Sequence, residues 1–237
     1  MKLKKSQLIV ALDVETLSEA KRVVNALSPV VNFFKVGSQL FTAYGPKAIE
    51  CVTSKGKKVF LDLKFHDIPN TVGNAVSSAV GLSKSLGVKE AVSLLTVHAV
   101  GDGEMLQHAV KAAQTTAKEL KVARPKILGI TVLTSDVGLT NTREVVLQRA
   151  TLAYDNGLDG VVASCQEAAY IRQKFGKDFI IVTPGIRPAG QDAQDQKRVA
   201  TPSQAIQSGS NFLVVGRPIV KASNLLQAAK QVLKEMS

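Results

Sequence analysis

The segment LDLKFHDIPNTV, residues 61–72, carries two carboxylates, one lysine and one histidine within six consecutive positions. Asp62 and Lys64 are separated by a single residue, and Asp67 follows three positions after the lysine. Charged groups at this density are costly to bury unless they pair or take part in chemistry. Carboxylates on either side of a lysine keep its ammonium charged and fixed in place, ready to stabilise negative charge and to donate a proton. The segment is therefore the first candidate for a catalytic site.

Residues 58–65, KVFLDLKF, are typical of a β-strand that leads into this segment. Side chains alternate along a strand, so Phe60, Asp62 and Lys64 share one face while the apolar residues between them share the other. Packing of the apolar face against helices would turn the charged face toward the inside of a closed sheet. Because both charged residues come late in the strand, they would lie at its carboxyl end, where barrel enzymes keep their chemistry.

Short apolar segments alternate with longer amphipathic ones along the whole chain. We predict eight strands, at 7–14, 33–37, 58–65, 91–99, 126–135, 159–165, 179–186 and 211–219. We predict eight helices, at 18–28, 44–55, 69–86, 102–120, 141–156, 166–175, 201–208 and 222–235. Thr201 and Pro202 stand where a helix should begin, and Gly56 and Gly176 stand where helices should end.

Eight strand–helix units in succession, with no linker or break in composition, predict a single α/β domain over residues 1–237. Its parallel sheet would close as a (β/α)8 TIM barrel. A doubly wound open sheet is the alternative, but ALDVETLS stands where a dinucleotide-binding version would have a glycine-rich turn. The stretch RPAGQDAQDQKRVA, residues 187–200, is longer than most connections, which usually indicates a functional loop or lid.

Neighbouring strands repeat the pattern of charge near their carboxyl ends. The first predicted strand ends in Asp13, and the second carries Lys35 within FFKVG. In a barrel these two residues converge with Asp62 and Lys64 on one rim, and Asp67 lies just beyond. A structural ion pair needs two charges, whereas five converge here, so we favour an active site over a structural bridge.

A second group of residues suggests where a phosphate would bind. Barrels often grip phosphate with the loops that follow strands 7 and 8. Here those strands end in TPGIRP (183–188) and VVGRPIV (214–220). Each combines a glycine, which allows close backbone approach, with an arginine, which can make a bidentate contact. The sequence therefore predicts a phosphate site between Arg187 and Arg217.

The composition limits the classes of partner. Lysine and arginine outnumber aspartate and glutamate by 30 to 19, a formal charge of +11 that admits a phosphorylated metabolite. The basic residues are scattered and tryptophan is absent, which disfavours a nucleic-acid-binding surface. No apolar run is long enough to span a bilayer, so we expect no membrane partner. Cys51 and Cys165 match no ligand spacing, so we expect free thiols and a cytoplasmic location.

Taken together, these segments resemble the orotidine 5′-phosphate decarboxylases. The resemblance centres on DLKFHDIPNTV, which holds Asp62-x-Lys64-x-x-Asp67, and it runs the whole chain through ALD, FKVG, TVHA, LTS, TPGIR, DQKRV and VGRPI. It implies removal of the C6 carboxylate of orotidine 5′-monophosphate (OMP), giving UMP and CO2 in pyrimidine biosynthesis. It also implies that neither a metal ion nor a cofactor takes part.

The resemblance further implies roles for individual residues. Lys64 would protonate the carbanion-like C6, and Asp62 would lie beside the departing carboxylate. Lys35 and Asp13 would complete a charge network that orients the ribose hydroxyls. Asp67 and Thr71 would reach the active site of a partner subunit in a homodimer with shared sites. Thr134 or its neighbour Ser135 would contact the pyrimidine. Gln196 would bridge base and phosphate. The phosphate itself would be bound by Arg187, Gly216 and Arg217.

Three other classes of protein are alternatives. A metal-dependent sugar-phosphate lyase or synthase on the same barrel is the closest rival, but it would place an acid at Lys35, because a divalent cation needs oxygen ligands. A non-catalytic metabolite-binding barrel would not need so costly a charge network, and a nucleic-acid-binding protein is the least favoured. We expect His98 to hydrogen-bond locally at a strand end, and Cys165 to end a strand as a small core residue.

Overall fold

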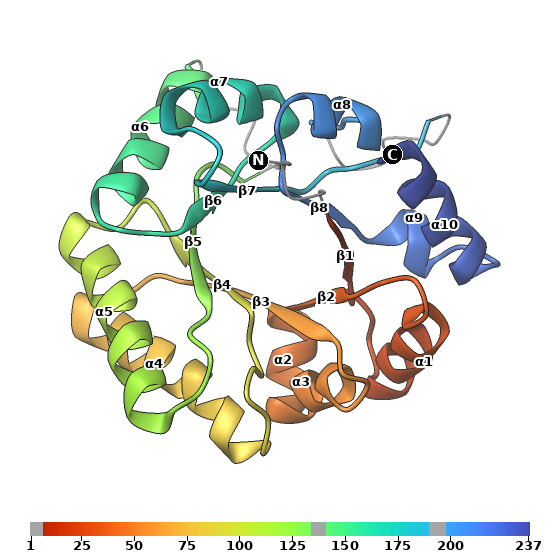
Figure 1. Ribbon diagram of the computed structural model, residues 1–237, viewed down its shortest axis with the longest axis horizontal. Coiled ribbons are helices and arrows are strands. Elements are labelled where there is room, and N and C mark those ends of the chain that lie inside the picture. The colour runs from red at the N-terminus through yellow and green to blue at the C-terminus, as the bar shows by residue number, and fades with distance from the viewer. Residues whose placement is uncertain (1–6, 134–140, 190–197) are drawn as a thin grey trace.

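The computed structural model describes residues 7–133, 141–189 and 198–237 of the chain. Eight parallel strands pair in sequence order, and the last pairs with the first, so the sheet is a closed barrel (Figure 1). The strands are β1 (Gln7–Ala11), β2 (Phe33–Gly37), β3 (Lys58–Phe65), β4 (Leu94–His98), β5 (Lys126–Ile130), β6 (Gly160–Val162), β7 (Ile180–Thr183) and β8 (Phe212–Val215). The closed barrel confirms the predicted fold class and excludes the open sheet.

Helices surround the strands as an outer ring (Figure 1). They are α1 (Leu17–Leu27), α2 (Ser38–Tyr44), α3 (Pro46–Thr53), α4 (Pro69–Ser85), α5 (Gly103–Leu120), α6 (Thr142–Asp155), α7 (Cys165–Phe175), α8 (Pro202–Gln207), α9 (Arg217–Val220) and α10 (Leu225–Glu235). None of the helices in the described part of the chain is long and apolar enough to cross a membrane.

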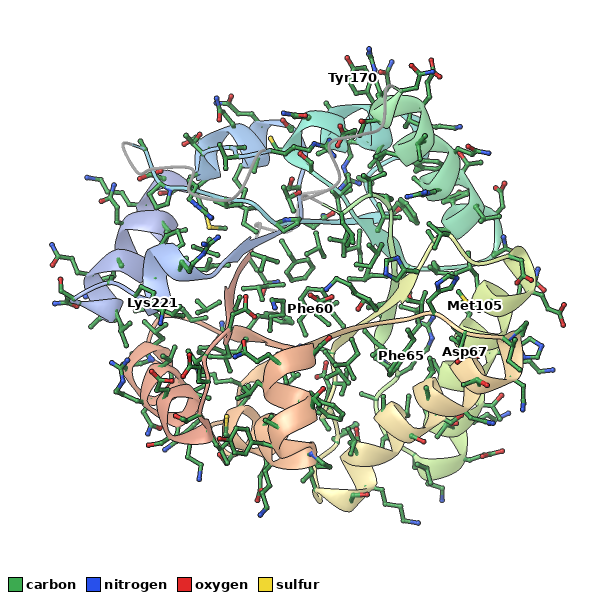
Figure 2. All side chains as sticks on the ribbon, turned by 180° about the vertical axis from the view of Figure 1, so that it is seen from behind. Phe60, Phe65, Asp67, Met105, Tyr170 and Lys221 are labelled. Atoms are coloured by element: carbon green, nitrogen blue, oxygen red, sulfur yellow. The ribbon has the colours of Figure 1, made fainter. Side chains whose placement is uncertain are left out.

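The two faces of each strand serve two separate cores. Val59 and Leu61 of β3 belong to the large outer core between barrel and helices, whereas Phe60 belongs to a smaller cluster inside the barrel. Figure 2 shows Phe60 near the middle of the barrel. Burying both faces removes a large apolar area from water, which is the main driving force for folding. The predicted face assignment of this strand is therefore correct, and it turns Asp62 and Lys64 inward.

Helix starts follow the expected capping chemistry. Thr201 caps α8 through a reciprocal capping box with Gln204, and Pro202 occupies the first turn, as predicted. The predicted helix 44–55 is wrong at its start. The chain forms two helices there, α2 and α3, because Gly45 adopts a left-handed φ of +54° and Pro46 begins a new helix.

Several predicted strands are too long at their carboxyl ends. The strand predicted at 211–219 ends at Val215, and Arg217 begins the short helix α9 after Gly216. Cys165 likewise begins α7 instead of ending a strand, and its Sγ lies 3.4 Å from the Ser208 hydroxyl. Strands of three or four residues are enough to close this part of the barrel, so the residues beyond them are available for the rim. The single domain over 1–237 stays a prediction.

Candidate active site

Four charged side chains form one continuous network inside the carboxyl end of the barrel. Lys64 Nζ lies 2.8 Å from Asp62 Oδ2, and Lys35 Nζ lies 3.8 Å from the same oxygen. Lys35 Nζ also donates to Asp13 Oδ1 at 2.8 Å. The charges thus alternate in the order Asp13, Lys35, Asp62 and Lys64, across the ends of β1, β2 and β3. The structure brings together four of the five residues that were predicted to converge.

The middle of this network is shielded from water and its two ends are more open. The side chains of Lys35 and Asp62 expose only 12% and 11% of their surface, whereas Lys64 exposes 33% and Asp13 exposes 53%. Electrostatic interactions are stronger where water is excluded. The arrangement therefore presents a paired ammonium, that of Lys64, at the partly exposed edge of a buried charged cluster.

The backbone of Lys64 adopts an uncommon conformation. Its φ of +53° lies in the left-handed region, which a residue with a side chain rarely enters. The pairing of β3 with β4 also shifts here: Leu61 pairs with Leu95, but the next paired residue of β3 is Phe65, opposite Val97. Strained backbone of this kind clusters at functional sites. The irregularity lies at Lys64, the residue that the family resemblance implies as the proton donor.

Two residues beside the network were not predicted from the sequence. Thr96 of β4 is fully buried and contacts both Asp62 and Lys64 through hydrogen bonds. Gly37 ends β2, and a Cβ atom at that position would lie 2.9 Å from Lys35 Nζ and 3.4 Å from Asp13 Oδ1. Real Cβ atoms essentially never approach another atom within 3.0 Å, so the absence of a side chain at Gly37 makes room for the Lys35 ammonium.

Asp67 and Thr71 stand apart from the network. Both are exposed, and the Asp67 carboxylate accepts a hydrogen bond from the backbone N–H of Ile68 at 2.7 Å. Figure 2 shows Asp67 farther from the barrel centre than Phe60. Ile68 exposes 66% of its surface, which is unusual for a large apolar residue. Within one chain these residues do not join the other charges, so their predicted role needs a partner subunit.

The predicted phosphate-binding residues follow the carboxyl ends of the neighbouring strands β7 and β8. Gly216 follows β8, and a Cβ atom there would lie 3.7 Å from Asp13 Oδ2, so this turn packs against the network. Arg217 is half-buried as the first residue of α9. Arg187 follows β7, is 8% exposed, and donates through its guanidinium to the Ile186 carbonyl at 3.0 Å.

The long connection after β7 is held at both ends. The Arg187 N–H donates to the Ala200 carbonyl at 2.9 Å, and the Ala200 N–H donates to the Gly185 carbonyl at 3.2 Å. Arg198 forms a buried ion pair with Glu167. The two ends of the connection therefore lie side by side at the rim. Gln196 falls within this connection, but it lies outside the described residues, as do Thr134 and Ser135 at the other predicted base contact.

His98 was expected to hydrogen-bond locally at the end of its strand. Its Nδ1 atom is buried and has no hydrogen-bond partner within the described residues. Burial lowers the pKa of His98, and the nearby His66, Lys64 and Arg149 lower it further. The ring centroid lies 5.7 Å from that of His66. A lowered pKa favours the uncharged form of this imidazole beside Lys64.

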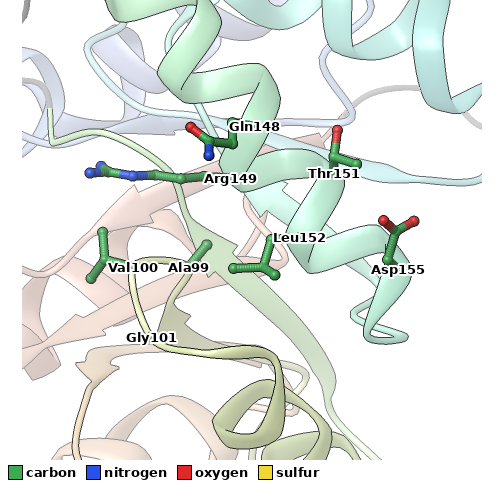
Figure 3. Close-up of a pocket in the computed structure, with 8 residues that line it drawn as sticks. All are labelled: Ala99, Val100, Gly101, Gln148, Arg149, Thr151, Leu152 and Asp155. Atoms are coloured by element: carbon green, nitrogen blue, oxygen red, sulfur yellow. The ribbon is translucent and has the colours of Figure 1, made fainter.

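A cavity of about 570 Å³ opens elsewhere on the barrel, between the chain that follows β4 and helix α6 (Figure 3). Ala99, Val100 and Gly101 line one side, and α6 residues including Arg149 line the other. Arg149 donates to the Thr131 carbonyl at 2.6 Å. None of the residues that line this cavity belongs to the charge network, so the candidate active site is the charge network and not this cavity. Over the described ranges, no three histidine, cysteine or acidic side chains gather as a metal-binding group.

Comparison with known proteins shows the family of this chain. A family model described as "Orotidine 5'-phosphate decarboxylase / HUMPS family" matches residues 6–232. Two curated proteins named orotidine 5′-phosphate decarboxylase, from Heliobacterium modesticaldum and Moorella thermoacetica, are 46% and 45% identical. Each match covers 98% of this chain, and 96% and 92% of those relatives. The crystal structure of orotidine 5′-phosphate decarboxylase from Lactobacillus acidophilus is 35% identical with a TM-score of 0.81, covering 98% of this chain and 99% of that one. The chain therefore belongs to the orotidine 5′-phosphate decarboxylase / HUMPS family.

Proposed function

We propose that this protein catalyses the decarboxylation of OMP to UMP and CO2 in pyrimidine biosynthesis. The observation that carries the proposal is the alternating network of Asp13, Lys35, Asp62 and Lys64 in a chain of this family. Loss of CO2 leaves an electron pair in an sp² orbital of C6, which the pyrimidine ring cannot delocalise. Stabilisation must then come from charge that is already in position before the reaction. The proposal assigns this charge to the Lys64 ammonium, whose pairing with Asp62 Oδ2 at 2.8 Å supports the assignment.

In the proposed step the bond between C6 and the carboxylate breaks and its electron pair stays on C6. Lys64 Nζ donates a proton to C6, which completes UMP, and the resulting neutral amine takes a proton from solvent. Asp62 lies beside the departing carboxylate and crowds it with like charge, which the loss of CO2 relieves. Because Asp62 Oδ2 is 2.8 Å from Lys64 Nζ, it also keeps that ammonium charged and directed.

The remaining residues bind the substrate in this proposal. Lys35 and Asp13 orient the ribose hydroxyls. Asp13 is the most exposed member of the network, and Lys35 is bonded to it at 2.8 Å. Thr134 or Ser135 contacts the pyrimidine, and Gln196 bridges base and phosphate. The phosphate contacts come from Arg187, Gly216 and Arg217. Binding energy from a phosphate far from C6 can be used to assemble the reactive geometry.

The reaction is proposed to need neither metal nor cofactor. A metal-dependent sugar-phosphate enzyme remains the closest rival. A divalent cation would require oxygen ligands, and the two carboxylates nearest the site are Asp13 and Asp62. The Lys35 ammonium lies 2.8 Å from the first and 3.8 Å from the second, so it occupies the position between them and repels a cation. This geometry favours decarboxylation over metal chemistry.

We also propose a homodimer with shared active sites in the cytoplasm. The exposed rim residues Asp67, Ile68 and Thr71 support an interface in this region, because they stand apart from their own network and are accessible to a second chain. The two cysteines are free, as is usual in a reducing compartment.

The proposal is tested by adding OMP to the purified protein and following the ultraviolet absorbance as UMP forms. The assay is run in parallel with excess chelator and with added magnesium. We expect equal turnover in both. No conversion of OMP in either would overturn the proposed activity, whereas activity that chelator abolishes and magnesium restores would overturn its independence of metal.

A further inference from the structure

We propose that Thr96 is a positioning residue for the proposed decarboxylation, acting through Asp62 and Lys64 without touching the substrate. The inference rests on the proposed function of the charge network. Its central observation is that one buried hydroxyl, that of Thr96, contacts two residues of the network. It bonds to the carboxylate of Asp62 and to the backbone N–H of Lys64, the proposed proton donor.

Thr96 lies on β4, next to β3, and none of its surface is exposed. Its hydroxyl donates to Asp62 Oδ1 at 3.0 Å, and it accepts a hydrogen bond from the backbone N–H of Lys64 at 2.9 Å. A hydroxyl has one donor and two acceptor positions, so the two bonds are made together. One side chain therefore holds both the Asp62 carboxylate and the Lys64 backbone.

The contact with Lys64 replaces a hydrogen bond that the sheet does not supply. The strand pairing passes from Leu61 opposite Leu95 to Phe65 opposite Val97, so β3 contains more residues than β4 over this stretch. A buried N–H without a partner is unfavourable, and so is a left-handed φ in a residue with a side chain. The Thr96 hydroxyl satisfies this N–H at the point where Lys64 has φ +53°. It thereby holds the irregular backbone that directs the Lys64 side chain.

The contact with Asp62 fixes how its carboxylate is turned. Oδ2 faces the ammonium groups of Lys64 and Lys35, and Oδ1 is the atom that accepts from Thr96. With Oδ1 held, the carboxylate cannot rotate away from the two lysines. Misplacement of a reacting group by about 1 Å can reduce turnover about a hundredfold. Substrate binding should depend less on Thr96, because the proposed ribose and phosphate contacts come from β1, β2, β7 and β8.

The test compares Thr96→Val, which keeps the shape but removes the hydroxyl, with Thr96→Ser, which keeps the hydroxyl. Ser83→Ala is the matched control, because the buried Ser83 hydroxyl also accepts a backbone N–H, that of Ala91 at 3.0 Å, but lies outside the network. We expect Thr96→Val to lower kcat for OMP by about ten- to a hundredfold with little change in KM. Thr96→Ser should recover most of this loss, and Ser83→Ala should lose thermal stability but keep kcat.

Equal losses in Thr96→Val and Thr96→Ser, a rise in KM alone, or an unchanged kcat in Thr96→Val would each overturn the inference. If Thr96→Val does not fold at the assay temperature, Thr96→Cys takes its place, and its weaker thiol should give kcat below that of Thr96→Ser. Failure of the proposed function is distinguishable, because the wild type would then not convert OMP. Crystal structures of wild type and variant test the geometry independently of activity: unchanged positions of Asp62 and Lys64 Nζ would also overturn the inference.

Discussion

The Asp62 carboxylate and the Lys64 ammonium lie on the same face of β3, with Oδ2 and Nζ 2.8 Å apart. The same oxygen lies 3.8 Å from Lys35 Nζ, so one carboxylate serves two cations. Removal of one partner from a buried ion pair leaves an uncompensated charge and is strongly unfavourable. The network should therefore respond sharply to small changes around it.

Gly37→Ala is expected to impair catalysis although it adds only one methyl group. Its Cβ would lie 2.9 Å from Lys35 Nζ, so the ammonium must shift, and we expect the shift to disturb its contacts with Asp13 and Asp62. We expect kcat/KM for OMP to fall by about tenfold or more, which corresponds to at least 1.4 kcal/mol. The control is Gly81→Ala in α4, where an added Cβ meets nothing within 4 Å. Equal activity of the two variants would show that Lys35 tolerates displacement.

If active sites are shared across a dimer, two inactive variants should restore activity when their subunits are mixed. Asp67 is exposed at the rim of its own barrel and stands apart from its own network, so it is available to a neighbouring site. Mixing Asp67→Ala with Lys64→Ala should restore activity. A heterodimer of these chains has one site with both lesions and one site with neither, so its activity should approach half that of the wild-type dimer. Absence of recovery after demonstrated subunit exchange would show that each barrel uses its own Asp67.

Arg217 should act on the phosphate of the substrate. Arg217→Ala would lose a charge-assisted contact of about 1.5–3 kcal/mol, so kcat/KM for OMP should fall by roughly ten- to over a hundredfold. Orotidine, which lacks the phosphate, should react poorly with wild type and be almost indifferent to the change. Lys221→Ala, an exposed cation at the end of the same short helix, is the control. Equal losses with both substrates would assign Arg217 to the fold or to the base pocket.

Asp159 should stabilise the fold in a manner that depends on pH. Burial by itself raises the pKa of this carboxyl, but hydrogen bonds from Arg124, the Ile127 N–H and Lys126 outweigh it and hold the pKa below the ordinary value of 3.8. A lowered folded-state pKa contributes stability above the unfolded pKa, and this stability is lost as the pH falls through the folded value.

The variant Asp159→Asn should lower the free energy of unfolding by about 2 kcal/mol at pH 7, because hydrogen bonds to a charged group are lost. The difference from wild type should shrink as the pH falls below about 4. Denaturant unfolding at several pH values measures this, with the exposed Asp155→Asn as control. A difference that stays constant down to pH 2 would contradict the ionic origin of the stabilisation.

The sequence predicted the barrel and the inward face of β3 because both follow from simple periodicity. Alternation of apolar residues fixes which side chains of a strand share a face, and eight repeated units fix the closed sheet. Strand ends were less predictable. The apolar run through Val215 and Ile219 hides the change to helix α9, since an apolar run alone does not separate a strand from a short helix. The glycine and proline around Arg217 were the available signal.

Thr96 could have been suspected but not assigned from the sequence. It alternates with Leu94, which faces the inside of the barrel, so its inward direction was predictable. Its contact with Lys64 depends on the shift in pairing between β3 and β4, which no local pattern reveals. Gly37 was missed for a similar reason, because the space it leaves is filled by a side chain from its own strand. The roles of Thr134, Ser135 and Gln196 stay predictions, since these residues lie outside the described ranges.

The most direct test of the account is the turnover of OMP by Lys64→Ala, measured with chelator present beside wild type and Lys58→Ala. Lys58 lies at the opposite end of β3 with half of its side chain exposed, so its removal tests the strand without touching the network. The account predicts that Lys64→Ala stays folded and loses at least two to four orders of magnitude in kcat, since both a positioned acid and its electrostatic role vanish, while Lys58→Ala keeps wild-type turnover. A loss of less than about tenfold in Lys64→Ala would contradict the assignment of Lys64 as the acid.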